Sequence, residues 1–302
     1  MRNTRIEWAD MTWNPVTGCQ HGCKYCYARR IADRFSSKDP DAVIETANCN
    51  NLHVLQEPYV YNGKTEPYPF GFQPTLHKYH LDQPAKVKTG KLIFVGSMTD
   101  LFGEWVPDEW IREVFEACRK APQHEYLFLT KNPGRYYGLI EKGIATDKDQ
   151  NFWFGSTVTD EEHCRFFYKR GFHSFLSCEP LLGPWTFSKW TLGYLRGLYG
   201  GCYCPDWVIL GAETGNRAGK VVPEKSWIEG ITKVCFSMRV PVFMKDSLLP
   251  IMGEEGMKRE FPLAMGARRL VDAAYKCGVA VEQAAESLES LAKAAERRKE
   301  NA

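Results

Sequence analysis

Three cysteines stand close together near the start of the chain. The segment GCQHGCKYCYA contains Cys19, Cys23 and Cys26, three of the eleven cysteines in the sequence. Gly18 and Gly22 permit the sharp turns that would let three thiols converge in so short a loop. The spacing C-x3-C-x2-C therefore predicts a metal site.

Two kinds of metal centre fit three clustered thiols. Structural zinc sites take four protein ligands, and His21 or Cys49 could complete such a set. Iron–sulfur clusters favour thiolate ligands, and a cubane has four iron corners. Three cysteines would then leave one iron open to another molecule. At this level both centres remain candidates.

Polar residues follow each of several apolar runs farther along the chain. Glu179 and Glu213 come at the ends of two such runs, where an unpaired buried carboxylate would be costly. We therefore treat both as candidate catalytic residues lining a ligand site. Cys178, beside Glu179 at the end of the same run, is a further candidate catalytic residue, with a small buried hydrophobic residue as the alternative.

The apolar runs predict strands that end at a common rim. They cover residues 91–100, 125–133, 152–160, 174–183, 206–215 and 240–247. Amphipathic segments alternate with them and predict helices at 27–37, 107–121, 134–143, 161–171 and 223–238. We expect Thr159 and Asp160 to cap the helix that begins at Glu161.

This alternation predicts a parallel sheet covered by helices, because strands that are apolar throughout are buried on both faces. We interpret it as an α/β fold, a partial (β/α)6-type barrel whose chemistry lies at the carboxyl ends of the strands. A Rossmann-like sheet is the alternative. The sequence contains no dinucleotide fingerprint of glycines and no phosphate-loop lysine motif.

The predicted barrel domain spans residues 1–261, and two segments of the chain depart from the alternation of strands and helices. Residues 39–90 are too long for a plain connection, so we interpret them as an insertion or lid, with a surface flap as the alternative. Residues 262–302 predict a C-terminal helical extension, a hairpin broken near Gly278. That extension would pack on the barrel or form a dimer contact.

Charge and composition narrow the functional classes. The net charge is only +2, so no global basic field indicates a nucleic-acid partner. The N-terminus lacks the apolar core of a signal peptide, and no run approaches the roughly 18 apolar residues of a membrane span. We expect a cytoplasmic protein without a membrane partner. Its clustered thiols would be reduced and available for a metal.

The cysteine loop resembles the signature of the radical SAM superfamily, in which an aromatic residue, here Tyr25, precedes the third cysteine. Longer blocks between residues 5 and 250 resemble an uncharacterised, phage-associated three-cysteine-motif family placed near spore photoproduct lyase. These blocks are IEWADMTWNPVTGC, VGSMTDLFGEWVP, LTKNPGRY, SCEPLLGP and WVILGAETGNRAGKVVP.

This resemblance implies a 4Fe–4S cluster held by the three cysteines, with S-adenosylmethionine (SAM) chelated by the open iron. Reductive cleavage of SAM gives methionine and a 5′-deoxyadenosyl radical, which abstracts hydrogen from a substrate. Cys178 could then donate a hydrogen atom to the substrate radical. An external electron donor such as flavodoxin or ferredoxin is implied. So is the cytoplasm of a bacterial or phage-infected host cell.

The resemblance also suggests residues that contact SAM. Many radical SAM proteins hold the methionyl amino group with a Gly-Gly-Glu-like stretch, whose place here begins Gly96-Ser97. The glutamate is absent from this chain. The resemblance therefore leaves that role to backbone carbonyls, to Ser97 or to Asp100.

Four further residues complete the implied cofactor site. Lys131 would meet the methionyl carboxylate, with Thr130 beside it at the end of the same strand. Ser156 would bond the ribose. Tyr25 would lie near the adenine.

For the substrate, we favour a nucleic-acid base or nucleotide that is modified or repaired. The likeness to spore photoproduct lyase and the aromatic insertion, which could stack on an extruded base, support this choice. The candidate aromatics are Tyr59, Tyr61, Tyr68, Phe70 and Phe72, and the candidate phosphate contacts are Lys86, Lys88 and Lys91.

Other functions compete with this one. A radical SAM enzyme acting on a peptide or small metabolite is one alternative. A non-catalytic, zinc-bearing nucleic-acid-binding protein is another, although the near-neutral charge argues against it. Cys202 and Cys204 are loop cysteines or, alternatively, ligands of an auxiliary cluster. The sequence makes no prediction of oligomeric state.

Overall fold

The computed structural model describes residues 1–48, 52–184 and 204–265. Cys49 and Cys202 fall outside these ranges. The predictions of a zinc ligand at Cys49, of an auxiliary cluster using Cys202, and of a helical hairpin over nearly all of residues 262–302 therefore lie outside the described residues.

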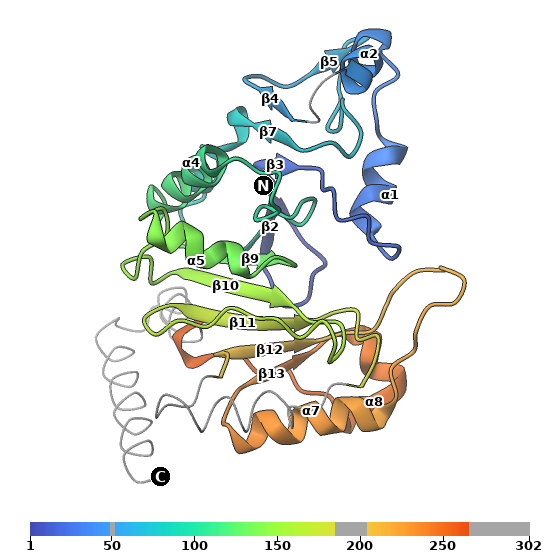
Figure 1. Cartoon of the computed structure of the whole chain (residues 1–302), viewed down its shortest axis with the longest axis vertical. Helices are drawn as coiled ribbons and strands as arrows, with labels where there is room; N and C mark the ends of the chain where they lie inside the picture. Colours follow the sequence, from blue (N-terminus) through green and yellow to red (C-terminus); the bar gives the residue numbers. More distant parts are fainter. Residues whose placement is uncertain (49–51, 185–203, 266–302) are drawn as a thin grey trace.

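A large mixed sheet forms the centre of the described chain (Figure 1). Its order is β1 (Arg2–Asn3), β2 (Met11–Trp13), β8 (Leu92–Val95), β9 (Glu125–Thr130), β10 (Phe152–Thr157), β11 (His173–Cys178), β12 (Trp207–Leu210) and β13 (Val242–Met244). β1 is antiparallel to β2, and every other neighbouring pair is parallel. All six strands predicted from apolar runs are confirmed.

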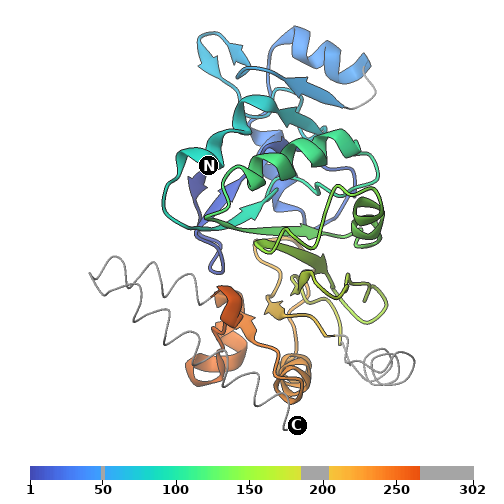
Figure 2. The same ribbon diagram turned by 90° about the vertical axis from the view of Figure 1, so that its left-hand side faces the viewer.

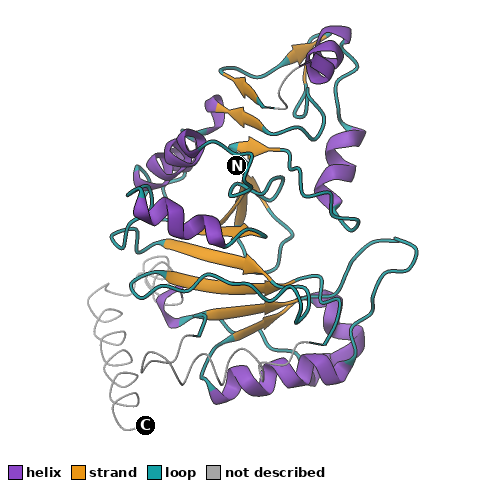
Figure 3. Ribbon diagram, viewed as in Figure 1, coloured by secondary structure: helices purple, strands orange, loops and turns teal. Residues whose placement is uncertain are grey.

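Helices accompany the strands, as Figure 3 shows. α1 (Tyr27–Arg34), α4 (Asp108–Arg119), α5 (Gly134–Glu141) and α7 (Lys225–Ser237) confirm four of the predicted helices. The 3-10 turn η2 (Asp246–Leu248) and α8 (Leu249–Gly256) follow β13. In α4, Ile111, Val114, Phe115 and Cys118 are buried, which is the face expected from their three- and four-residue spacing.

The helix predicted to begin at Glu161 is wrong. Residues 161–170 form turns and irregular chain instead. Asp160 does accept a hydrogen bond from the His163 amide, 2.9 Å away, but it also accepts one from the His163 ring at 2.7 Å. These contacts close a single turn, and the chain after it is irregular.

Each face of the parallel sheet packs against a different apolar layer. Side chains alternate between the faces with a period of two along a strand. On one face, a buried cluster combines side chains of α4 and α5 with four aromatic residues of the strands: Tyr126, Phe128, Phe152 and Phe154. The intervening residues, including Leu127 and Trp153, belong to a second cluster on the opposite face. Burial of both faces explains why the strands are apolar throughout.

The N-terminal segment covers the inner face, which is the face that carries Leu127 and Trp153. Trp8 is 2% exposed and packs on Phe94, with ring centroids 4.8 Å apart, and on Trp207 from β12. The carboxylate of Glu7 accepts a hydrogen bond from the amide of Asp246 just after β13. Because residues 11–13 form β2 at the other side, this segment spans the sheet from one side to the other.

Residues 39–90 fold around two small sheets at one end of the molecule, away from α7 (Figures 1 and 2). Their elements are α2 (Pro40–Asn48), β4 (His53–Leu55), β5 (Val60–Tyr61), β6 (Lys64–Thr65), β7 (Thr75–His77), η1 (Lys78–His80) and α3 (Gln83–Lys86). β7 pairs with β3 (Val16–Thr17), directly before the cysteine loop. The insertion thus supports that loop.

We expect Gly155→Ala in β10 to destabilise the protein by about 1–3 kcal/mol, because overpacking forces neighbouring atoms to shift. A Cβ at this position would lie 2.2 Å from the ring of Phe175, which is fully buried. Urea unfolding measures the change in free energy of unfolding.

Gly138→Ala in α5 is the matched control, because a Cβ there meets nothing within 4 Å. This change should be neutral or stabilise the helix by up to about 1 kcal/mol. Equal unfolding free energies for the two variants would contradict the close packing of β10 against Phe175.

Candidate cofactor site

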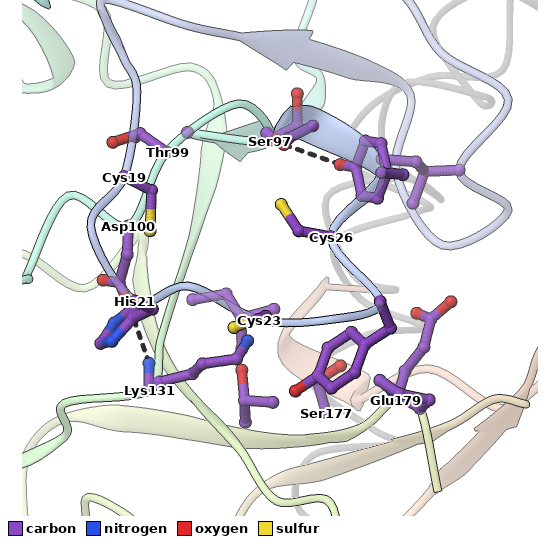
Figure 4. Close-up of a pocket in the computed structure, with 18 of the residues that line it drawn as sticks. Cys19, His21, Cys23, Cys26, Ser97, Thr99, Asp100, Lys131, Ser177 and Glu179 are labelled. Atoms are coloured by element: carbon purple, nitrogen blue, oxygen red, sulfur yellow. Dashed lines mark hydrogen bonds and ion pairs between the residues drawn. The ribbon is translucent and has the colours of Figure 1, made fainter. Parts of the chain in front are cut away.

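A cavity of about 360 Å³ opens at the carboxyl ends of the parallel strands (Figure 4). Most of the predicted site residues line it: Cys19, Cys23, Tyr25, Cys26, Gly96, Ser97, Asp100, Thr130, Lys131, Glu179 and Glu213. The structure therefore brings together residues that lie almost two hundred positions apart in the sequence.

Each parallel strand from β8 to β13, or the short segment that follows it, supplies at least one polar side chain to the cavity. Examples, in strand order, are Ser97, Thr130, Thr157, Ser177, Glu213 and Lys245. The prediction that the strands deliver hydroxyl and charged groups to one rim is confirmed. Both faces of the sheet are covered by apolar side chains, so polar side chains are accommodated at the strand ends.

The start of the cysteine loop is clamped from two sides. The Gly18 amide donates to the Met98 carbonyl at 2.9 Å, and the Thr99 hydroxyl donates to the Gly18 carbonyl at 2.5 Å. Gly18 has φ +86°, and a Cβ there would lie 2.1 Å from the Gln73 carbonyl oxygen. Glycine is therefore required for the loop to pass between these two segments.

The end of the loop is the first turn of α1. Cys26 is the N-cap residue, and its Sγ accepts a hydrogen bond from the Arg29 amide at 3.3 Å. The Arg29 guanidinium donates to the Cys19 carbonyl at 3.1 Å and lies over the Phe72 ring. These contacts fix the Cys26 thiol at the start of α1 and tie the two ends of the loop together.

The three thiols surround the open part of the cavity (Figure 4). Burial raises the pKa of Cys19 to about 11, so its thiol is protonated at neutral pH without a metal. Metal ligation needs the thiolate, and loading would therefore release a proton. In the described part of the chain, no three His, Cys, Asp or Glu side chains are grouped tightly enough to hold a single metal ion.

Asp100 is a hub of hydrogen bonds: it connects the cysteine loop to the end of β9. Its carboxylate accepts hydrogen bonds from the His21 ring at 2.7 Å, the Thr130 hydroxyl at 2.7 Å and the Lys131 amide at 2.9 Å. Burial opposes its charge, but these donors outweigh burial and lower the pKa of Asp100. Both oxygens are engaged, so Asp100 positions the loop rather than standing free for a methionyl amine. The His21 nitrogen bonded to it is equally unavailable as a zinc ligand.

Two predicted site residues do not reach the cavity. Ser156 is fully buried, and its hydroxyl accepts a hydrogen bond from the Phe167 amide at 2.9 Å. Cys178 is fully buried in an apolar cluster with Leu210, and burial raises its pKa. The predicted ribose contact at Ser156 and hydrogen-atom donor at Cys178 therefore have no geometric support.

The neighbours of these two residues line the cavity instead. Thr157 and Ser177 take the places predicted for Ser156 and Cys178, because adjacent side chains on a strand point to opposite faces. Sequence reasoning missed Ser177, although strict alternation counted from the apolar residue Leu176 could have found it.

The two candidate carboxylates are both paired. Both oxygens of Glu213 accept from the Arg217 guanidinium, at 2.6 and 2.7 Å, and this pairing lowers the pKa of Glu213. Glu179 forms an ion pair with Lys245. Neither residue is therefore an unpaired carboxylate at the cavity wall.

The insertion contributes packing more than an exposed aromatic surface. Phe70 is 3% exposed and stacks on His53, with centroids 3.9 Å apart. Phe72 is buried under Arg29, where it lines the cavity. Phe70 and Phe72 are therefore too buried to belong to the predicted stacking platform, whereas its other members are half-buried and their role stays a prediction: Tyr59, Tyr61 and Tyr68. Lys86, a predicted phosphate contact, pairs with Asp82 at 2.6 Å.

Residues 3–260 match the family described as "Protein of unknown function (DUF5131)", and the chain belongs to this family. The match includes the cysteine loop and every strand from β2 to β13. No curated protein and no solved structure matches the chain. Among the described residues, no helix has the length and apolar character needed to cross a membrane.

We expect Asp100→Asn to destabilise the protein by about 1–3 kcal/mol. The asparagine would place an NH₂ group where the carboxylate faces only donors, leaving a buried donor unsatisfied. Chemical denaturation of the metal-free chain measures this cost.

Asp82→Asn serves as the control, because Asp82 is 60% exposed and forms an ion pair with Lys86 four residues on. Its loss should cost no more than about 0.5 kcal/mol. Similar costs for the two substitutions would contradict the role of Asp100 as a hub.

Proposed function

We propose that this member of the DUF5131 family is a radical SAM enzyme whose sheet is a partial (β/α)6-type barrel. The observation that carries the proposal is the position of Cys19, Cys23 and Cys26. All three line one cavity at the carboxyl ends of the parallel strands, where enzymes of parallel α/β architecture keep their chemistry.

The donor set fits a 4Fe–4S cluster better than a single zinc ion. Zinc needs its ligands around one centre, whereas the thiolates of a cluster bind separate irons and stand farther apart. No group suited to one ion is present in residues 1–48, 52–184 and 204–265. Cys19, Cys23 and Cys26 would hold the cluster and leave one iron for a small molecule in the cavity.

When bound, the cluster and SAM would supply reductive cleavage of SAM and abstraction of hydrogen from a substrate. The protein's contribution is binding, orientation and exclusion of water. The cavity has an apolar floor, formed by Ile6, Trp8, Phe94 and Leu129.

Lys131 is the candidate for the methionyl carboxylate. Its ammonium lies 5.7 Å from the centroid of the Tyr25 ring, and both residues line the cavity. The Asp100 contact to the Lys131 amide holds this backbone in place. Among residues 1–48, 52–184 and 204–265, Lys131 forms no ion pair, so its ammonium can offer a point charge to an anion.

Residues 96–98 offer acceptors for an amino group. The Ser97 carbonyl accepts from the Tyr27 hydroxyl at 2.7 Å, and the Gly96 carbonyl accepts from the Thr99 amide at 3.1 Å. A carbonyl oxygen has two lone pairs, so each retains one for a further donor. The Ser97 hydroxyl donates to Asn14, which fixes the loop.

For the substrate we propose a nucleic-acid base or nucleotide, with a peptide or small metabolite as the alternative. The reaction needs an external one-electron donor such as flavodoxin or ferredoxin, and we place the enzyme in the cytoplasm. The support for the base is the apolar, partly aromatic cavity floor beside polar strand ends, which suits a planar ring.

Anaerobically reconstituted protein should be brown and hold about four irons and four sulfides per chain. Replacing Cys19, Cys23 or Cys26 with alanine should remove most of the iron and the visible absorbance. Cys164→Ala, outside the loop, should leave both unchanged. A colourless protein carrying stoichiometric zinc would overturn the proposal.

Reduced, reconstituted protein given SAM should slowly release 5′-deoxyadenosine. Lys131→Ala should weaken SAM binding about tenfold or more, because a charged hydrogen bond is lost, while iron content is unchanged. Lys120→Ala, at the exposed end of α4, is the control. Equal SAM affinity in both variants would show that another residue meets the carboxylate.

A further inference from the structure

We infer that Glu179 and Lys245 form a subsite for the lactam edge of a nucleobase, where a ring N–H lies beside a C=O. This inference rests on the proposed function, since it names the substrate group that the same cavity would take. Glu179 directly follows β11 and Lys245 directly follows β13, on the side of the sheet away from β8, whose following loop clamps the cysteines.

The pair is built into the fold rather than formed by chance at the surface. The side chains of Lys245 and Glu179 are only 14% and 25% exposed, and both line the cavity. A Cβ on Gly211 would lie 3.1 Å from Glu179 and 3.2 Å from Lys245. Glycine at this position therefore leaves the space in which the two chains meet.

The pair keeps hydrogen-bonding capacity after pairing. Only Glu179 Oε1 bonds to Lys245, and no other partner of either charged group is found within the described ranges. An ammonium has three donors and a carboxylate about four acceptor sites. Adjacent free donor and acceptor positions thus face the cavity, and half-buried charged groups gain from a partner that uses both.

The cavity floor next to this pair supplies a second observation. Trp8 is 2% exposed and lines the cavity, and its indole N–H has no hydrogen-bond partner among the described residues. Buried indole N–H groups usually have an acceptor. The Glu7–Asp246 hydrogen bond places this segment beside the end of β13, next to Lys245.

These features together select the ligand chemistry. Lys245 can donate to a ring carbonyl, and Glu179 can accept from the neighbouring ring N–H. Trp8 and Phe94 offer aromatic surface to the ring, and the free indole N–H suits a second carbonyl. Uracil and thymine carry this arrangement, and guanine presents the same lactam edge with one carbonyl. A zwitterionic amino acid could also bridge the ion pair, but it would leave the apolar floor uncovered.

The test is calorimetric titration of the reconstituted full-length chain with uridine, thymidine and guanosine. We expect at least one of them to bind. For uridine or thymidine, its 3-methyl analogue should bind about tenfold or more weakly, because the methyl group removes the N–H that Glu179 accepts. For guanosine, the 1-methyl analogue is the corresponding probe.

Variants identify the residues. Glu179→Gln and Lys245→Met should each weaken binding of that nucleoside about tenfold or more. Lys225→Met breaks an exposed pair with Glu229 on α7 and should leave the affinity unchanged. Far-ultraviolet circular dichroism confirms folding, and the double variant, which leaves neither charge unpaired, should fold and bind as weakly as the single ones.

The outcomes separate this inference from the proposed function. Iron-loaded protein that binds none of the three nucleosides, or binds the methylated analogues equally well, overturns the subsite and leaves the cluster proposal standing. Binding of free glycine or alanine in place of nucleosides, abolished by the same variants, also overturns it. Lactam-specific binding by a chain that takes up no iron would support the subsite and refute the radical SAM assignment.

Discussion

Burial of both faces of the parallel sheet is the constraint on which the rest of this structure depends. Helices α4, α5 and α7 cover one face, and the segment around Trp8 covers the other. Uncompensated polar groups are costly inside such layers, so polar side chains gather where the strands end. The cavity, the cysteine loop and the charged pairs lie at that edge, because burying these polar groups between the apolar layers would cost free energy.

The hydrogen bonds of Asp100 turn this edge into a defined site. One buried carboxylate connects the cysteine loop through His21, the end of β9 through Thr130, and the backbone of Lys131. Such a group contributes less by its charge than by satisfying several donors at once. It fixes the thiols relative to the lysine that we propose as the carboxylate contact.

The cavity has two chemically different ends. Thiols and aromatic rings surround the end formed by the cysteine loop, whereas a half-buried ion pair forms the end at β11 and β13. The proposed cofactor at the first end and the proposed recognition pair at the second would orient a substrate between them. The insertion strengthens the first end, since β7 pairs with the strand that leads into Cys19.

Local chemistry alone determined part of this protein. Cysteine spacing, apolar runs and amphipathic periodicity act over a few residues, and they correctly predicted the three clustered thiols, the six strands of the rim and four helices. The segment after Asp160 has the polarity pattern of the correctly predicted helices, but its hydrogen bonds close only one turn.

Tertiary structure decided which side chain of each strand end faces the cavity. Because neighbouring side chains on a strand point to opposite faces, Thr157 lines the cavity in place of Ser156, and Ser177 lines it in place of Cys178. It also decided that Asp100, Glu179 and Glu213 are paired, because their partners arrive from other elements or from a loop whose path the sequence does not specify.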